Sequence, residues 1–362
     1  MRILMMAPHA TAPGPVPGIV NALATALRSR GHEVQTTTWG GGVGAARHGS
    51  RVLARLQDVH AAARSARDFS PDVVVVHTAH NDGAFYRDAV LALAFRLRRI
   101  PFAVEFHGSD PERVLAHPHG RAAYISRRIA RAACGVLLLS SAEAIEWRRF
   151  EPRGRYHVVE NPYEPPAGGR SEAPGSAPTL RLVFAGRHVP GKGLLTTVAA
   201  LGRVADPSAY SLDIFGDGPE RDAAVEAAGS APVPIIVHGY VTRDEVVAQM
   251  READVFVLPT SWPEGFPTVI AEAMGAGMAI VTTRHRGSAD HLAEGKNALF
   301  VPAADPEELA RAFDRLAADR ALVARMGAAN AEAAGVFGPA AVAERYEAVL
   351  DSCVRAQEGR DA

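Results

Sequence analysis

Short apolar runs alternate along the first half of the chain with longer segments in which apolar residues recur at helical spacing. Apolar runs bordered by Gly, Pro or polar residues are typical of buried strands, and the longer segments are typical of amphipathic helices. The predicted strands are Arg2–Met6, Val73–His77, Phe102–Phe106, Val136–Ser140 and His157–Glu160. The predicted helices include Ile19–Arg30, Asp88–Arg99 and Gly120–Ala133. Strands that alternate with helices predict a parallel sheet that is covered on both faces.

The second half of the chain repeats this pattern. Its predicted strands are Leu180–Ala185, Leu212–Phe215, Ile235–His238, Val255–Leu258, Ala279–Thr282 and Ala298–Val301. Its predicted helices include Arg243–Ala253, Val269–Ala276, Pro306–Ala318 and a last amphipathic segment at about Ala340–Arg355. The chain is therefore predicted to have an α/β fold with two doubly wound, Rossmann-like domains. Ligands of such domains bind at the carboxyl ends of the strands, here facing the crevice between the domains.

A segment rich in Pro, Gly and Ser separates the two halves. It reads NPYEPPAGGRSEAPGSAPT and covers Asn161–Thr179. Such a composition is typical of a linker. We predict an N-terminal domain over residues 1–165, a linker over 166–178 and a C-terminal domain over 179–336. The length of 362 residues suits two domains of ordinary size.

The composition excludes several classes of protein. Hydrophobic residues make up 48% of the chain, which is enough for two cores. No apolar run approaches the roughly 18 residues that span a bilayer. The N-terminus, MRILMMAPHATAPG, lacks the long apolar stretch of a signal peptide. The two cysteines, Cys134 and Cys353, have no metal-binding or redox spacing, so we expect a cytoplasmic enzyme without a disulfide.

The net charge of −1 hides an asymmetry between the halves. Residues 1–170 contain 22 Arg, no Lys and 14 Asp plus Glu, a balance of +8. Subtracting these from the chain totals of 39 and 40 leaves 17 against 26, a balance of −9. Arginines cluster at Arg96, Arg98 and Arg99, and again at Arg127, Arg128 and Arg131. Such clusters are typical of helix C-termini and solvated faces. Docking to an anionic membrane surface or an acidic acceptor is the alternative.

The segment FAGRHVPGKGLLT, Phe184–Thr196, nearly matches the phosphate-binding loop G-x-x-x-x-G-K-[ST]. Gly193 stands where that loop needs a hydroxyl for magnesium, and Pro190 removes a backbone N–H that would face phosphate. We therefore reject the P-loop interpretation. Arg187 and Lys192 flank a tight turn and could instead hold a diphosphate with their side chains. A solvent-exposed cationic turn is the alternative.

Two loops at predicted strand ends of the first half carry candidate residues. The segment Ala7–Val20 contains His9 and Gly14 ahead of a predicted helix start, which attracts anions. His107 ends an apolar strand in EFHGSD, where Asp110 follows. An ordinary turn and a structural histidine would also explain these features. Their predicted place at the crevice favours function, and we take His9 and Asp110 as candidates for the acceptor side.

The most informative segment is PTSWPEGFPTVIAEAMGAG, Pro259–Gly277. Glu264 lies in a predicted turn, and Glu272 lies eight residues later inside an apolar helix. Burying a carboxylate in that helix is costly unless it accepts strong hydrogen bonds, which a ribose diol would supply. Pairing with an arginine is the alternative. The backbone N–H groups of Gly265–Thr268 stand at the helix start, where phosphate is favoured.

With these residues the chain resembles family 4 of the retaining glycosyltransferases, which have the GT-B architecture. The resemblance is carried by Glu-x7-Glu within SWPEGFPTVIAEAMGAG and by GRHVPGKG. Further agreement comes from LATALRSRGHEV, DIFGDGPER, ADVFVLPTSW and FVPAADPEELA. It covers nearly the whole chain and is most specific between residues 180 and 305. It implies two Rossmann-like domains that face each other across a cleft, with the C-terminal helix, 340–358, completing the N-terminal domain.

The resemblance also assigns roles to residues. Arg187 and Lys192 match the pair that neutralises the donor diphosphate, and Glu272 matches the acid that holds the ribose. Glu264 matches the acid near the sugar hydroxyls, and His107 matches the histidine beside the transferred sugar. The remaining donor-binding candidates are backbone-rich positions: Gly14, Gly186, Gly216, Gly239, Tyr240, Val241, Gly265, Phe266, Pro267 and Thr268.

The implied reaction is transfer of a sugar from a nucleoside-diphosphate sugar, with a UDP-sugar favoured, to an unidentified acceptor hydroxyl with retention of configuration. The acceptor would be a small molecule or lipid-linked. Metal-using transferases usually carry Asp-x-Asp, which this chain lacks, so we expect no metal and no other cofactor. Two departures, Gly14-Pro15 in place of Gly-Gly and TTRHRGSADHL after the donor helix, leave acceptor and sugar specificity open. A sugar-nucleotide 2-epimerase of similar architecture and a catalytically inactive binding module are the alternatives.

Overall fold

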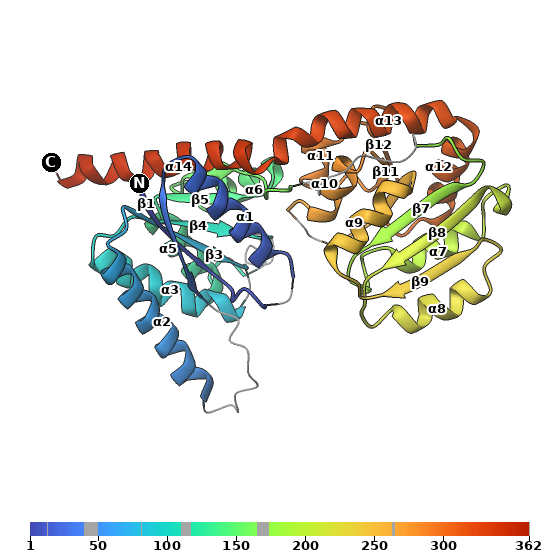
Figure 1. Ribbon diagram of the computed structural model, residues 1–362. Coiled ribbons are helices and arrows are strands. Elements are labelled where there is room, and N and C mark those ends of the chain that lie inside the picture. Colours follow the sequence, from blue (N-terminus) through green and yellow to red (C-terminus); the bar gives the residue numbers. More distant parts are fainter. Residues whose placement is uncertain are drawn as a thin grey trace. The chain divides into compact units, whose positions relative to one another are not determined.

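The computed structural model describes residues 1–12, 14–39, 50–80, 82–109, 117–164, 174–262 and 265–361. Contacts divide the chain into two compact units. The first unit comprises Met1–Glu164 and Phe337–Ala362, and the second comprises Pro165–Val336. Each unit is built around a six-stranded sheet (Figure 1).

The sheet of the first unit has the strand order β2-β1-β3-β4-β5-β6. Its strands are β1 (Arg2–Ala7), β2 (Glu33–Thr38), β3 (Val73–Thr78), β4 (Phe102–Phe106), β5 (Gly135–Leu138) and β6 (Tyr156–Val158). Every pairing between these strands is parallel. The carboxyl ends of all six strands therefore lie at one edge of the sheet.

Helices cover both faces of this sheet. They are α1 (Val16–Ser29), α2 (Ser50–Phe69), α3 (Asp82–Leu97), α5 (Arg121–Ala132), α6 (Ser141–Phe150) and α14 (Pro339–Asp361). On one face, side chains of α1 and α14 pack with Val75 and Ala103 of the sheet. On the other face, Trp147 of α6 and Phe95 of α3 pack with Val74 and Val104. Alternate residues of each strand thus feed two separate cores, as expected for a parallel sheet buried on both sides.

Helix α14, drawn in red in Figure 1, belongs to the first unit although it follows the second unit in the sequence. It packs against α1 and against β3, β4 and β5. Val342, Tyr346 and Leu350 point into the core at helical spacing and are fully buried. The last segment of the chain is therefore part of the first unit's core.

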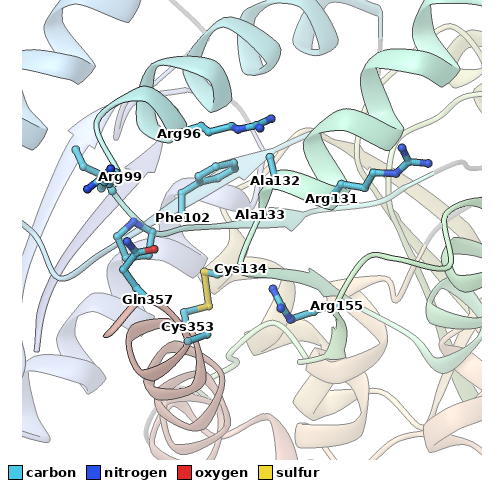
Figure 2. Close-up of a pocket in the computed structure, with 13 residues that line it drawn as sticks. Arg96, Arg99, Phe102, Arg131, Ala132, Ala133, Cys134, Arg155, Cys353 and Gln357 are labelled. Carbon is cyan, nitrogen blue, oxygen red and sulfur yellow. A yellow bond between two sulfur atoms is a disulfide. The ribbon is translucent and has the colours of Figure 1, made fainter. Parts of the chain in front are cut away.

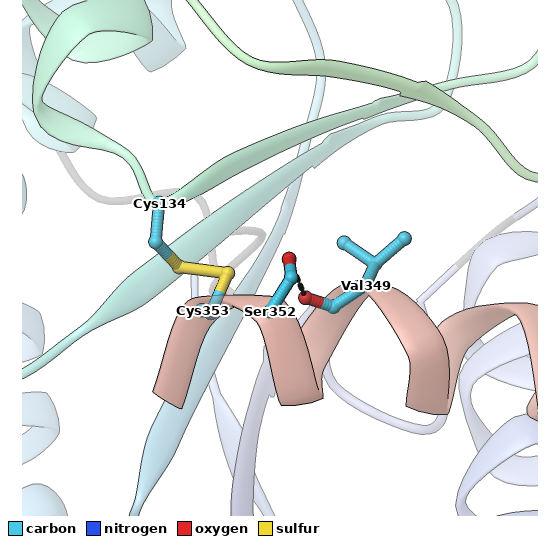
Figure 3. The surroundings of a disulfide bond; sticks show 4 residues. All are labelled: Cys134, Val349, Ser352 and Cys353. Atoms are coloured by element: carbon cyan, nitrogen blue, oxygen red, sulfur yellow. Dashed lines mark hydrogen bonds between the residues drawn. A yellow bond between two sulfur atoms is a disulfide. The ribbon is translucent and has the colours of Figure 1, made fainter. Parts of the chain in front are cut away.

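A disulfide joins Cys134, which immediately precedes β5, to Cys353 on α14 (Figure 3). The Cα atoms are 5.1 Å apart, and 219 residues separate the two cysteines in sequence. Gly135 lets the helix come close, since a Cβ at this position would lie 3.2 Å from Val349. Our expectation that neither cysteine forms a disulfide was wrong. Spacing along the chain gave no sign of the pair because only the return of α14 to the sheet brings it together.

The sheet of the second unit has the order β12-β11-β10-β7-β8-β9, and all pairings of its strands are parallel. Its strands are β7 (Leu180–Ala185), β8 (Tyr210–Phe215), β9 (Ile235–Gly239), β10 (Val255–Leu258), β11 (Ala279–Thr282) and β12 (Ala298–Phe300). Its helices are α7 (Leu194–Leu201), α8 (Arg221–Gly229), α9 (Arg243–Glu252), α10 (Thr268–Gly275), α11 (Ser288–His291), α12 (Pro306–Ala318) and α13 (Arg320–Ala333). The strand order reverses between β7 and β10, so the ligand position expected for such a sheet is at their carboxyl ends.

The prediction of two doubly wound, Rossmann-like α/β domains is confirmed. Among the described strands, β2 was the one that was missed, and the predicted helices did not include α2, α6, α7, α8, α11 and α13. Strand β2, EVQTTT, lies at the sheet edge with Val34 as its one buried residue, so it carries no apolar run. Helix α2 has a weakly apolar sequence and gave no clear periodicity. Most of the predicted linker, namely its residues 166–173, lies outside the described residues.

In the described part of the chain, no helix combines the length and the apolar character that crossing a membrane requires.

Candidate active site

In the second unit, the predicted glycine turns come together at the carboxyl ends of β7, β8 and β9. The Gly186 amide donates to the Phe215 carbonyl at 3.1 Å, and the Gly216 amide donates to the Gly239 carbonyl at 2.8 Å. Gly216 has a φ of +126°, and a Cβ there would overlap the carbonyl oxygen of Gly186. Only glycine fits this position, because both the backbone conformation and the space exclude a side chain.

Lys192 and Arg187 lie in the turn between β7 and α7. The Lys192 side chain is buried, with the residue only 7% exposed. Burial lowers the pKa of Lys192 to about 8, and the neighbouring Arg187 guanidinium contributes to the same shift. Arg187 itself is exposed and stands over the ring of Trp262, 5.3 Å from its centre. The structure thus brings together the two cations that the sequence singled out.

This turn is anchored to the end of β10. The Gly191 carbonyl accepts from the Ser261 amide at 2.7 Å and from the Thr260 hydroxyl at 3.1 Å. Gly193, with a φ of +84°, packs so closely on Pro259 that a Cβ would lie 2.6 Å from its carbonyl oxygen. The cationic turn after β7 and the segment after β10 are therefore packed and hydrogen-bonded to each other at the point where the strand order reverses.

His188 was not predicted as a site residue. Its backbone links the turn that carries Arg187 and Lys192 to the loop after β8. It is fully buried, and burial lowers the pKa of its ring. Its backbone amide donates to the Asp217 carbonyl at 2.8 Å, and its carbonyl accepts from the Glu220 amide at 2.9 Å. These bonds join the Arg187–Lys192 turn to the loop after β8. The signal that could have found it is its position between the two cations.

The segment Gly265–Thr268 leads into α10, and Pro267 immediately precedes the helix. The loop that precedes α11 holds this segment in place, because the Gly287 amide donates to the Gly265 carbonyl at 2.7 Å. Phe266 is buried, with its ring centre 4.9 Å from that of His291. The stretch TTRHRGSADHL thus supports this segment through Gly287 and His291.

Glu272 is buried on α10 and accepts a hydrogen bond at 2.6 Å from Nε of Arg243, which opens α9. This is the arginine pairing that we considered as the alternative to a ribose contact. The Arg243 side chain is 53% exposed, so solvent can reach the pair from the side of the arginine.

Tyr240 and Val241 follow β9 and precede Arg243 in the sequence. Tyr240 is 83% exposed, and Val241 is half-buried. An aromatic ring this exposed can stack on a planar ligand.

In the first unit, His107 follows β4 at the carboxyl edge of the sheet. Its side chain is only 7% exposed, and burial lowers the pKa of its ring. Its Nε2 is 3.2 Å from Nδ1 of His77 on β3, which in turn is 2.7 Å from Oε2 of Glu105. Sequence reasoning missed His77 and Glu105. A histidine and an acid at the ends of two otherwise apolar strands were the available signal.

His77, Glu105 and His107 also form the one group of described residues whose possible metal-ligating atoms all lie within 4.8 Å of one another. The separations of 2.7 and 3.2 Å are those of hydrogen bonds. We interpret the group as a hydrogen-bonded network.

The N-terminal loop carries His9 and Gly14. Nδ1 of His9 is 2.8 Å from the Thr11 hydroxyl, and Gly14 precedes α1. His9 lines a cavity of about 250 Å³ together with residues of α1 and with the end of β2. Two predicted site residues, Asp110 and Glu264, lie outside the described residues.

The arginine clusters of the first unit have mixed surroundings. Arg127 donates to the Pro118 carbonyl at 2.7 Å, and Arg131 pairs with Glu151 at 2.7 Å. Arg128 stands over the ring of Tyr124. Local contacts therefore explain much of this cluster.

A cavity of about 500 Å³ lies at the amino ends of β4, β5 and β6, on the opposite edge from His107. Figure 2 shows Arg96, Arg99, Arg131 and Arg155 around it, with the Cys134–Cys353 disulfide in its wall. Among its described lining residues there is no carboxylate. The cavity is therefore cationic through Arg96, Arg99 and Arg155, whereas Arg131 is paired with Glu151.

Two protein families match the chain. The family described as "Glycosyl transferase 4-like domain" matches residues 18–162, and the family described as "Glycosyl transferases group 1" matches residues 179–319. Each match covers most of one unit.

Curated relatives match parts of the chain. The lipopolysaccharide core biosynthesis glycosyltransferase LpsE of Rhizobium meliloti is 32% identical over 182 residues, 50% of this chain and 52% of LpsE. The N,N'-diacetylbacillosaminyl-diphospho-undecaprenol alpha-1,3-N-acetylgalactosaminyltransferase of Campylobacter jejuni is 25% identical over 154 residues, 42% of this chain and 36% of that enzyme. The match thus spans about half the length of the first relative and less of the second.

Among solved structures, HepE from Anabaena in complex with UDP superimposes with a TM-score of 0.76 at 17% identity. The match covers 97% of this chain and 100% of HepE. At this identity the likeness shows the fold.

Proposed function

This chain belongs to the GT-B glycosyltransferases of the family 4 kind, and on that premise we propose that it moves a sugar from a nucleoside-diphosphate sugar to an acceptor hydroxyl with retention of configuration. A UDP-sugar is the favoured donor, because HepE of the same fold binds UDP. The observation that carries the proposal is the cationic turn of Arg187 and Lys192 at the reversal of strand order in the second unit.

The chemistry follows from where charge develops. When the bond between the anomeric carbon and the diphosphate breaks, negative charge grows on the departing phosphate oxygen. Arg187 and Lys192 stabilise this charge from fixed positions, which is the largest effect that such a site supplies. A buried ammonium with a pKa of about 8 is still mostly protonated at neutral pH, and a bound diphosphate favours that charged form. The chain thus offers two positive charges of its own, and we propose a reaction without a metal ion.

The retaining outcome is proposed to arise from attack on the same face that the diphosphate leaves. The acceptor oxygen bonds to the anomeric carbon as the bond to the phosphate oxygen breaks, and the acceptor proton passes to that phosphate oxygen. Glu264 is proposed to hold the sugar hydroxyls, and His107 is proposed to lie beside the transferred sugar.

Glu272 is proposed to hold the ribose diol of the nucleotide. Its pairing with Arg243 fits this role, because an exposed arginine can turn away or share the carboxylate when a ligand arrives. The pair also explains how a buried carboxylate is tolerated without ligand.

The acceptor is proposed to be a sugar linked through a diphosphate to a lipid, like the substrate in the name of the Campylobacter relative. The diphosphate makes such an acceptor anionic. The cationic cavity around Arg96, Arg99 and Arg155 is proposed to contact an anionic membrane surface, where such acceptors reside.

The proposal is tested by thermal unfolding in the presence of UDP, GDP, ADP and UDP-glucose. A ligand at a hundred times its Kd adds about 2.7 kcal/mol to the free energy of unfolding, so a true donor nucleotide gives a clear shift. We expect the largest shift with uridine ligands and a clearly smaller shift in Lys192→Ala at the same concentrations. Equal shifts in the wild type and in Lys192→Ala would contradict the proposed site.

A further inference from the structure

A buried row of polar side chains lies behind His107 in the first unit. His77 on β3 and Glu105 on β4 are register partners, so their side chains leave the same face of the sheet. Nδ1 of His77 is 2.7 Å from Oε2 of Glu105 and 3.2 Å from Nε2 of His107. The Tyr346 hydroxyl on α14 donates to the same Oε2. The row thus runs from Tyr346 through Glu105 and His77 to His107.

The face of the sheet that carries this row is otherwise apolar. Val75 and Ala103, two residues before His77 and Glu105, belong to the core beneath α1 and α14. His77, Glu105 and Tyr346 have no more than 1% of their surface exposed. An ionised carboxylate at such a position costs several kcal/mol, on the order of the desolvation penalty for a buried ion, unless it is fully paired. Packing alone would favour an apolar residue at position 105.

With Glu105 ionised, as its lowered pKa favours, the contacts within the row favour one assignment of donors and acceptors. A carboxylate only accepts, so the Tyr346 hydroxyl and the Nδ1–H of His77 both donate to Glu105. The Nε2 of His107 that faces this Nδ1–H must then carry a lone pair. The proton of a neutral His107 ring is therefore on its Nδ1, which lies 3.8 Å from Glu105 Oε1, and the Asn161 side chain is a further partner of this ring.

We propose that Tyr346, Glu105 and His77 are positioning residues for His107, and that they fix its ring orientation and tautomer for the sugar-transfer step. This inference rests on the proposed function, in which His107 lies beside the transferred sugar. Because Tyr346 is on α14, the last helix of the chain takes part in turnover as well as in packing. The phenol ring of Tyr346 packs in the core, and its hydroxyl positions His107 through Glu105 and His77.

The first test separates the hydroxyl from the ring. In Tyr346→Phe we expect kcat for UDP-glucose to fall by about tenfold, while the Kd for UDP changes less than about twofold, because UDP contacts the second unit. Tyr210→Phe is the matched control. Tyr210 is equally buried and donates its hydroxyl to Asp314 at 2.8 Å, but it belongs to the second unit, whereas His107 belongs to the first. Wild-type kcat in a folded Tyr346→Phe would overturn the proposal.

The second test uses two substitutions of His77. The amide nitrogen of asparagine can take the place of the imidazole Nδ1 and donate to Glu105, whereas leucine fills the space without a donor. We expect His77→Asn to retain most of the kcat and His77→Leu to lose at least about tenfold. Equal values of kcat in the two variants would mean that His77 only fills space.

The third test is independent of turnover. In histidine-labelled protein, the ¹⁵N signals of the His107 ring, identified by their loss in His107→Gln, report its tautomer. We expect a neutral ring with its proton on Nδ1 in the wild type, and a mixture of tautomers in Tyr346→Phe and His77→Leu. A tautomer that these substitutions leave unchanged would overturn the proposal. If the tautomer responds as expected but no sugar nucleotide is turned over, the proposed function fails and the positioning row stands.

Discussion

The carboxylate of Glu272 accepts a hydrogen bond at 2.6 Å from Nε of Arg243, across the start of α9 and the interior of α10. Glu272 is buried and Arg243 is half exposed, so a ligand can reach the pair from the side of the arginine. Either the acid serves the nucleotide, or it only neutralises its partner. The difference between these two roles can be measured.

Glu272→Ala should weaken UDP by about ten- to hundredfold, because a hydrogen bond to a charged group is worth roughly 1.5–3 kcal/mol. Calorimetry with UDP and with its 2′,3′-dideoxy analogue identifies the contact. The wild type should bind the analogue more weakly than UDP, and Glu272→Ala should bind both alike. Arg243→Ala is the control and should retain the preference for the diol. If Glu272→Ala still prefers UDP to the analogue, Glu272 only neutralises Arg243.

Glu264→Ala, by contrast, should weaken the affinity for UDP-glucose and leave the affinity for UDP unchanged.

Lys192→Ala and Arg187→Ala should each slow sugar transfer by about 10²-fold or more, since each removes roughly 3 kcal/mol of leaving-group stabilisation. Steady-state turnover of UDP-glucose provides the measurement. Lys296→Ala is the matched control, because Lys296 is the only other lysine and is exposed in the same unit. Turnover near the wild-type value in Lys192→Ala would contradict a role for the Lys192 ammonium in stabilising the leaving group. EDTA should leave the wild-type rate intact, and a loss restored by magnesium would contradict the proposal that the chain supplies the charge itself.

UDP affinity should fall as the pH rises above about 8. The pKa of Lys192 in the free protein is about 8, because burial and Arg187 disfavour the ammonium. The diphosphate binds the charged form, so above this pH each binding event must also take up a proton. The Kd for UDP should be flat from pH 7 to the pKa and about tenfold weaker one unit above it. The terminal phosphate, with a pKa of about 6, stays ionised throughout this range. A Kd that rises equally in Lys192→Ala would assign the titration to another group.

Reduction of the Cys134–Cys353 disulfide should lower the free energy of unfolding of the first unit by about 2–4 kcal/mol, because the bond closes a long loop of the unfolded chain. Urea denaturation with and without reductant gives this value. A Cys134→Ser, Cys353→Ser double variant should unfold like the reduced protein and show no response to reductant. UDP affinity should stay unchanged, since the disulfide lies in the first unit. Identical unfolding midpoints for reduced and oxidised protein would contradict a stabilising role.

Replacing Arg96, Arg99 and Arg155 with Gln should weaken binding to phosphatidylglycerol vesicles by about hundredfold, at roughly 1 kcal/mol for each charge near the surface. Sedimentation with vesicles gives the bound fraction, and phosphatidylcholine vesicles report binding without charge. The charge-matched control replaces three exposed arginines of the second unit, Arg203, Arg311 and Arg325. An equal loss in that control would show that net charge acts, and would remove the cavity from the proposal.

The sequence alone determined the class of fold, because periodicity is a local property. Apolar runs such as Val73–His77 form strands wherever a sheet buries them on both faces, and the alternation with helices requires a parallel sheet. The cationic turn of Arg187 and Lys192 was also predicted from the sequence, because its residues are consecutive and nearly match the phosphate-binding loop pattern. Strand β2 could not be predicted in this way, because an edge strand with one buried residue has no apolar pattern.

The tertiary structure alone decided which distant residues meet. Glu105 and Tyr346 are 241 residues apart, Cys134 and Cys353 are 219 apart, and Arg243 and Glu272 are 29 apart. No local pattern encodes these pairs. The first two depend on the return of α14 to the first sheet, and the third depends on how α9 and α10 pack in the second unit. A buried acid is visible in the sequence as an anomaly in an apolar run. Its partner is set by whichever element packs against that face, and this is a property of the folded chain.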